Sequence, residues 1–317
     1  MIDLQLPSEA PARVAPPDLR GVFELGDDGA YRRWRDVKLR QQPTDVDALV
    51  VDVADPRRLS QAELAALLDR IARCNMAVYR SPVTVADRRL PLRLGAQLGL
   101  QRLDANWLAD EDGISPIAVD AGRGDAGEGG GAYIPYTSRA INWHTDGYYH
   151  PAQRRIHAMI LHCVRAAASG GDNLLMDHEL AYIALRDAEP RWVAALMNDD
   201  AMCIPARQGE GGVARAAPAG PVLSVDAGSG ALHMRYTART RSIEWKDDAP
   251  TREAAAFVRR LLDGDTDGDT AGRFALKLQP GMGLVGHNVL HARSAFVDDP
   301  GQPRLLYRAR YLDRVRG

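Results

Sequence analysis

The apolar residues of this chain follow two different periods, and the change from one to the other falls near residue 113. Before that point, ALVVDV from Asp47 and a later MAVYR read as short buried strands. Between them, apolar residues recur at helical spacing from Leu64 to Ile71, and Ser60 with Glu63 supplies a capping-box signal for the helix start. We therefore expect a strand–helix–strand unit that supports a larger sheet.

After residue 113 the pattern becomes one of many short strands separated by Gly, Pro and Asp turns, which is typical of a sandwich or jelly roll. Helical spacing interrupts this pattern at 178–197 and at 251–262. Residues 1–30 are rich in Pro and Gly and predict an irregular arm. The strand-like runs are SPIAVD, AINWHTD, RIHAMILHCV, NLLMD, PVLSVD, ALHMRYT, RFALKL, GLVGHNVL and RLLYRARYL.

Composition narrows the class of protein without naming a function. The chain is 45% hydrophobic and 26% charged, with a formal net charge of −2 and a pI near 6.5, so neither nucleic acid nor an anionic membrane is an expected partner. No run approaches the roughly 18 apolar residues of a membrane span, and the N-terminus lacks the pattern of a signal peptide. Three scattered cysteines suit a reducing compartment, so we expect a cytoplasmic protein.

Three short motifs suggest other functions but lack the context that those functions need. The GRGDAG of residues 122–127 is followed by EGGGAYIPYT, which cannot open the helix of a dinucleotide site. The acidic turn that begins at Asp263 has Phe274 where an EF-hand needs a bidentate Glu. His287 and His291 have the spacing of a zinc helix, but the glycines before them argue against a helix there.

A possible metal site begins with His144 and Asp146, in the extended segment INWHTDGYY. Residues i and i+2 of a strand point to the same face, so the imidazole and the carboxylate can share one ion. A second histidine from another strand would complete the facial triad that suits iron(II). With 8 histidines and 42 acidic residues in the chain, however, one such tripeptide is expected by chance.

Three downstream features give that tripeptide its significance. SGGDN at 169–173 turns the chain before a strand, and His291 follows in HNVLHARSAF. Arg304 and Arg308 then share one face of an alternating strand, RLLYRARYL. Because a buried Arg is costly unless a carboxylate meets it, this face predicts a bound carboxylate if it points inward, and an exposed cationic strand if it does not.

The ordered set W-H-T-D, G-G-D, N-x-x-x-H-x-R-x-A-F and R-x-x-x-R resembles the taurine dioxygenase (TauD/TfdA) family, which includes gamma-butyrobetaine hydroxylase-like enzymes. The resemblance covers residues 135–312. It implies a mixed α+β fold, with a double-stranded β-helix (jelly roll) core buttressed by helices, in a single domain over 1–317. It also implies Fe(II), with 2-oxoglutarate and O2 as cosubstrates, and hydroxylation of an unactivated C–H bond of a small acidic or zwitterionic metabolite, releasing succinate and CO2.

The resemblance assigns His144, Asp146 and His291 as iron ligands. It places His287 where the family often has Asp, as a residue that supports the ligands or the fold and does not itself bind the metal. Trp143, next to the first ligand, faces away from the metal by strand alternation. Its expected role is support from behind the site or ordinary packing.

The resemblance also implies a cosubstrate site and a substrate site. Arg304 matches the residue that binds the distal carboxylate of 2-oxoglutarate, and Asn173 stands where taurine dioxygenase has a Thr. Arg308 favours an acidic group on the substrate. Tyr148 and Tyr133 are candidates for the substrate wall, with ordinary packing as the alternative.

The segment 113–140, which contains a Gly-rich stretch, is the expected active-site lid. Two alternatives to the oxygenase stay open at this point. One is a zinc-dependent cupin-like hydrolase or isomerase, and the other is a non-catalytic metal-binding barrel. The sequence also leaves room for a homo-oligomer.

Overall fold

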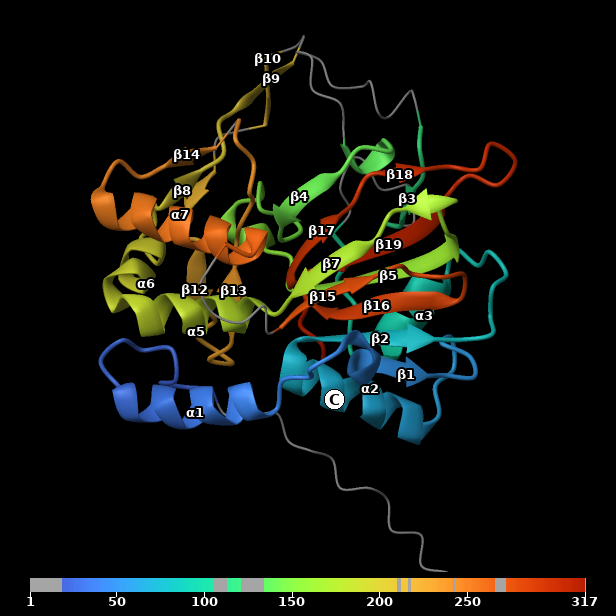
Figure 1. Cartoon of the computed structure of the whole chain (residues 1–317), viewed down its shortest axis with the longest axis horizontal. Coiled ribbons are helices and arrows are strands. Elements are labelled where there is room, and N and C mark those ends of the chain that lie inside the picture. The colour runs from blue at the N-terminus through green and yellow to red at the C-terminus, as the bar shows by residue number, and fades with distance from the viewer. Residues whose placement is uncertain are drawn as a thin grey trace, which may run out of the picture.

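Two β-sheets face each other at the centre of the molecule (Figure 1). The computed structural model describes residues 19–104, 113–120, 134–209, 212–215, 218–241, 243–265 and 272–316. The larger sheet has the order β1 (Val50–Asp52), β2 (Met76–Arg80), β16 (Met282–His287), β5 (Ala158–Arg165), β19 (Leu305–Tyr311) and β3 (Ser115–Ile117). The smaller sheet has the order β15 (Arg273–Leu276), β7 (Asn173–Met176), β17 (Leu290–Arg293) and β4 (Ile141–His144). Neighbouring strands are antiparallel except β1 and β2.

The alternation of side chains along β19 divides the core into two layers. Leu306 packs between the two sheets, together with Leu175 and Phe274 of the smaller sheet. Tyr307 and Tyr311 point to the opposite face of the larger sheet, into the core that it forms with α2 (Gln61–Cys74) and α3 (Leu90–Gln97). Strand geometry therefore places the arginines at positions 304, 308 and 310 on the side between the sheets.

A third layer covers the other side of the smaller sheet (Figure 1). It consists of α5 (His178–Ala188), α6 (Pro190–Leu196) and α7 (Ala249–Asp263), with the hairpin of β12 (Leu223–Val225) and β13 (Leu232–Met234). α1 (Asp28–Arg40) lies along α5, where Lys38 forms buried ion pairs with Asp177 and Glu179. Short strands complete the fold: β6 (Ser169–Gly170), β8 (Met202–Cys203), β9 (Arg207–Gly209), β10 (Gly212–Arg215), β11 (Ala219–Gly220), β14 (Glu244–Trp245) and β18 (Phe296–Val297).

The mixed α/β class and the predicted helix start at Ser60 are confirmed, and both arms of the capping box form. Two local predictions were wrong. The irregular arm predicted over 1–30 ends before residue 28, where α1 begins. Asp27 caps this helix by accepting a hydrogen bond from the Ala30 N–H. The strand expected from Asp47 begins at Val50, after a 3-10 turn. The helical structure predicted over 178–197 is confirmed as two helices, which are divided at Pro190 because proline cannot continue an α-helix.

The segment predicted as a lid, 113–140, is partly built into the sheet. Its residues Ser115–Ile117 form β3 and pair with β19 at the edge of the larger sheet, so this part does not serve as a lid. The Gly-rich stretch lies outside the described residues, as do Tyr133 and residues 1–18 of the predicted arm. Among the described helices, none has the length and apolar composition needed to cross a membrane.

Candidate metal centre

Two neighbouring strands bring the predicted ligands together. In the antiparallel pair of β4 and β17, His144 lies directly opposite His291, and Asp146 follows two residues after the first histidine. One potential ligand atom from each of the three side chains lies within 4.8 Å of the other two. Among the described residues this is the one group of three or more His, Cys, Asp or Glu side chains with such spacing.

Both imidazoles are prepared to act as neutral ligands. Nδ1 of His144 lies 2.9 Å from the carbonyl of Asn142, and Nδ1 of His291 lies 3.0 Å from the carbonyl of Val289. A carbonyl can only accept, so each Nδ1 carries the proton and each Nε2 keeps its lone pair for a metal. Burial, with the charge of His291, lowers the pKa of His144 to about 3, and burial also lowers the pKa of His291. Neither ring needs to lose a proton to bind a cation at neutral pH.

The two oxygens of Asp146 have different surroundings. Oδ1 lies 3.1 Å from Nη1 of Arg308 and 3.7 Å from Nη1 of Arg310. Oδ2 is buried and has no hydrogen-bond partner among the described residues. Burial alone would raise the pKa of this carboxyl, but the two guanidinium groups outweigh burial and hold the pKa below its usual range. The side chain therefore offers an ionised oxygen, and two imidazoles with one carboxylate form the donor set typical of non-haem iron(II) sites.

The main chain at Asp146 is fixed from both sides. Asn288 accepts a hydrogen bond of 2.7 Å from the Asp146 N–H, and its amide donates 2.7 Å to the Asp146 carbonyl and 2.9 Å to that of Ile156. Gly147 follows with φ of +69°, and a Cβ there would lie 2.5 Å from Cγ1 of Ile156. Asn288 was not predicted as a site residue from the sequence. Its position three residues before the predicted ligand His291, in HNVLH, could have indicated one.

A buried arginine beside the smaller sheet has unused hydrogen-bonding capacity. The guanidinium groups of Arg304 and Arg293 lie 5.0 and 4.8 Å from the ring centre of Phe296. Arg293 donates to backbone carbonyls, among them that of Thr137 at 2.7 Å. Arg304 is only 4% exposed, and its Nη1 has no partner among the described residues. Burial lowers the pKa of both groups, so a bound anion would relieve the cost of burying Arg304.

The structure separates the two histidines of HNVLH. Nδ1 of His287 lies 2.7 Å from Oδ1 of Asn75 and 3.0 Å from Nη2 of Arg314, and the residue is not part of the metal cluster. Trp143 packs into the core with α5, α6 and α7, so it faces away from the site as strand alternation predicts. The cluster of potential ligands therefore contains His291, whereas His287 belongs to a separate polar group.

Of the remaining predicted residues, Tyr148 and Arg308 lie next to the potential metal ligands, and Asn173 contacts a neighbouring strand. The ring of Tyr148 lies 6.2 Å from that of His144 in an edge-on arrangement, and Arg308 reaches Asp146. Asn173 lies on β7, opposite Arg293 of β17, and donates to the Leu276 carbonyl at 3.4 Å.

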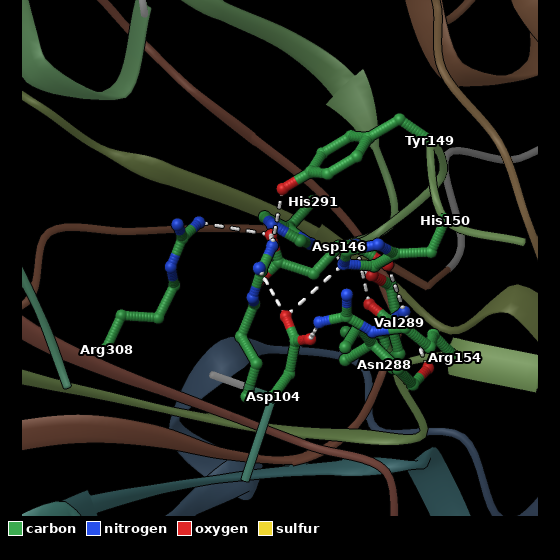
Figure 2. A network of polar contacts seen from close by, with 11 residues as sticks. Asp104, Asp146, Tyr149, His150, Arg154, Asn288, Val289, His291 and Arg308 are labelled. Atoms are coloured by element: carbon green, nitrogen blue, oxygen red, sulfur yellow. Dashed lines mark hydrogen bonds and ion pairs between the residues drawn. The ribbon is translucent and has the colours of Figure 1, made fainter. Parts of the chain in front are cut away.

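Sequence reasoning missed a further group of polar residues behind Asp146 (Figure 2). Asp104, Tyr149 and His150 lie there with Arg310, which is on the same face of β19 as Arg308. Asp104 stands in a stretch with no motif of its own. Its closeness to the site therefore gives no signal in the sequence.

Comparison with known proteins agrees with this geometry. The model of the taurine catabolism dioxygenase TauD, TfdA family matches residues 38–310. A uridine-5′-phosphate dioxygenase from Amycolatopsis sp is 35% identical over 180 residues, which are 55% of this chain and 62% of that relative. A uridine-5′-phosphate dioxygenase from Streptomyces sp is 32% identical over 176 residues, with the same two shares. The matched part of the chain thus spans less than two thirds of the length of either relative.

The fold is also found among solved structures. The non-heme iron oxygenase OrfP, in complex with Fe and alpha-ketoglutaric acid, superposes with a TM-score of 0.58 and 17% identity over 91% of this chain and 85% of that chain. The family match covers most of the sequence, including all three residues of the metal cluster and both arginines of the R-x-x-x-R motif. The resemblance noted from the motifs is confirmed, and the chain belongs to the TauD/TfdA dioxygenase family.

Proposed function

We propose that this protein is an Fe(II)- and 2-oxoglutarate-dependent dioxygenase that hydroxylates a C–H bond of a small anionic metabolite. The observation that carries the proposal is the convergence of His144, Asp146 and His291, with two neutral imidazoles and one carboxylate oxygen left without a partner among the described residues. A zinc hydrolase could use the same three ligands, but it would have no task for the buried Arg304.

The proposed core is a double-stranded β-helix. The order β3-β19-β5-β16 in the larger sheet and β4-β17-β7-β15 in the smaller one supports it, because consecutive strands of the chain alternate between the two sheets for much of their course. β1 and β2 then extend the larger sheet at one edge. We further propose a single oxygenase domain, and a cytoplasmic location supported by three free cysteines.

In this proposal the chain's own residues hold and orient the reactants. Nε2 of His144, Nε2 of His291 and Oδ2 of Asp146 hold the iron. Arg304 binds the distal carboxylate of 2-oxoglutarate, which gives a partner to the guanidinium nitrogen that has none among the described residues. When bound, iron with 2-oxoglutarate supplies the activation of dioxygen. Asn173 remains a candidate for a contact to the cosubstrate, through an amide in place of a hydroxyl.

The substrate that we propose carries a phosphate or another strong anion. Arg308 supports this, since its side chain is 12% exposed, lies beside the metal ligand Asp146, and would gain from a second anion. The uridine-5′-phosphate dioxygenases to which the chain is similar make uridine-5′-phosphate the first compound to test. Tyr148, near His144, offers an aromatic surface on which a base or sugar could pack.

The test is succinate formation by the purified full chain with Fe(II), 2-oxoglutarate, ascorbate and a small panel of substrates. Uridine-5′-phosphate is compared with uridine, which lacks the anion, and with a sulfonate and a carboxylate. Inorganic phosphate is measured as well, because hydroxylation at the carbon that bears the phosphate gives a hemiacetal phosphate that collapses to an aldehyde and free phosphate. Anaerobic protein that binds zinc but neither Fe(II) nor 2-oxoglutarate would refute the proposed function. Turnover of uridine equal to that of uridine-5′-phosphate would refute the proposed preference for an anionic substrate.

A further inference from the structure

A buried series of ion pairs joins Asp146 to Asp104 through Arg310. Figure 2 shows the two carboxylates. Nη2 of Arg310 lies 2.5 Å from Oδ2 of Asp104, and its Nη1 lies 3.7 Å from Oδ1 of Asp146. The same Nη1 donates a 2.9 Å hydrogen bond to the hydroxyl of Tyr149. Arg310 and Asp104 are only 3% and 1% exposed, so water does not screen these contacts as it does at the surface.

Asp104 is held in place at the far end of this series of ion pairs. His150 lies 3.3 Å from the oxygen that binds Arg310, and Arg154 donates to the other oxygen at 2.6 Å. Both oxygens of this fully buried carboxylate are therefore engaged. A carboxylate held in this way orients the guanidinium that it binds, since an arginine fork has a fixed geometry.

The consequence for Asp146 is an asymmetry between its two oxygens. Arg308 and Arg310 both approach Oδ1, whereas Oδ2 has no partner among the described residues. A carboxylate without such contacts can rotate and present either oxygen, or both, to a metal. Two guanidinium groups on one oxygen oppose that rotation, and they leave the other oxygen available to a metal.

The charge of Arg310 would by itself disfavour a cation nearby. Its guanidinium lies close to the single anionic ligand of the metal cluster, where an uncompensated positive charge would repel Fe(II). Asp104 supplies the compensating negative charge at 2.5 Å. The pair therefore orients Asp146 without adding net charge to the site. Arg308 is different, because it is 12% exposed and can turn towards a substrate.

We propose that Asp104 and Arg310 are positioning residues that hold Asp146 for binding the metal through Oδ2 alone. This inference rests on the proposed function, because it requires that the three-residue cluster binds a metal. It assigns a role to two buried residues that touch neither the metal nor the substrate in the proposed mechanism. Asp104 acts only through Arg310, and Arg310 acts on the orientation of the ligand.

The test measures Co(II) affinity and the visible absorption of the Co(II) protein, which reports the number and geometry of the ligands. Asp104→Asn and Arg310→Gln are each expected to weaken Co(II) binding by about 10- to 100-fold and to change the spectrum. Because Asp104 acts through Arg310, the double variant should bind Co(II) no more weakly than Arg310→Gln alone. Losses that add in the double variant would overturn the inference.

Glu179→Gln is the matched control. Glu179 is a buried carboxylate in an ion pair, 2.5 Å from Nζ of Lys38, and it is not a member of the metal cluster. This variant should lower the melting temperature while Co(II) affinity and spectrum stay as in the wild type. If Arg310→Gln does not fold, the nearly isosteric Asp104→Asn decides alone, and unchanged affinity and spectrum in it would overturn the inference. A wild-type protein that binds no Co(II) or Fe(II) would instead refute the proposed function.

Discussion

The rings of His144 and His291 face each other across one register pair of β4 and β17, with their centroids 4.2 Å apart. Each ring is oriented by a carbonyl two residues earlier in the chain. The distance between the two imidazoles is therefore set by strand pairing in the sheet rather than by a loop. A site built in this way is largely formed before the metal arrives, which reduces the cost of ordering the ligands on binding.

We expect His291→Ala to abolish Fe(II) binding and succinate formation, because the only other described histidine in the cluster is His144 and none can replace His291. His287→Ala is the matched control. It should keep Fe(II) binding but melt at a lower temperature, since it removes the contacts to Asn75 and Arg314. Anaerobic Fe(II) titration and thermal unfolding measure the two effects, and the opposite result would move the ligand to His287.

Arg304→Met should raise the apparent KM for 2-oxoglutarate by about 10- to 100-fold, the worth of a hydrogen bond to a charged group. The KM for the prime substrate should change much less, because Arg304 is expected to contact only the cosubstrate. Arg293→Met removes a buried arginine from the same aromatic ring, but one whose Nη1 and Nη2 both donate to backbone carbonyls. It should lower the melting temperature with a smaller effect on that KM. Equal effects of Arg304→Met on both KM values would contradict the assignment.

The metal-free protein should lose stability as the pH falls below about 6.5, the pKa of an unperturbed histidine. The folded state holds seven histidines with lowered pKa values, so the unfolded chain takes up protons first and stability falls progressively towards pH 4. Each proton that only the unfolded state binds changes the free energy of unfolding by about 1.4 kcal/mol per pH unit. Denaturant unfolding between pH 4 and 8 checks this, and a flat profile would contradict it. The residues are His144, His157, His162, His178, His233, His287 and His291.

Gly147→Ala should destabilise the protein and weaken Fe(II) binding, because the added Cβ would meet Ile156 and His150 at 2.5 and 2.8 Å, next to Asp146. Gly21→Ala is its control. Gly21 has φ of +77°, close to the +69° of Gly147, but no described atom lies within 4 Å of the point that its Cβ would occupy. That variant should lose only about 1–2 kcal/mol for the left-handed conformation and keep its Fe(II) affinity. Equal Fe(II) affinity in both variants would show that the turn does not position the ligand.

The parts of the site that lie on regular strands could be predicted from the sequence. Alternation along RLLYRARYL predicts that Arg304 and Arg308 share one face. The structure then shows which way that face points, because Leu306 between them lies in the core between the sheets. The i, i+2 spacing of His144 and Asp146 likewise predicts a shared face, and one described cluster contains both. Such patterns are local, so one segment of sequence is enough to show them.

The parts that depend on contacts between distant segments could not be predicted. Asp104 meets Arg310 only because the chain closes around the larger sheet, and no motif marks it. α1 was missed because its sequence, DGAYRRWRDVKLR, has few apolar residues. The helix is docked by a tertiary contact, the buried ion pairs of Lys38 with Asp177 and Glu179. Periodicity cannot reveal a partner that lies more than a hundred residues away.

The pair of guanidinium groups beside Asp146 has a consequence for what happens when that side chain is removed. In an Asp146→Gly variant, Arg308 and Arg310 would border the space left by the deleted carboxylate. Such a space is a receptor for a small free anion, such as formate or chloride, that can stand in for the missing ligand. Formate-dependent recovery of Co(II) binding would reveal it, and no recovery would mean that the arginines turn to other partners. The scaffold that positions a carboxylate would then also be able to recruit its replacement from solution.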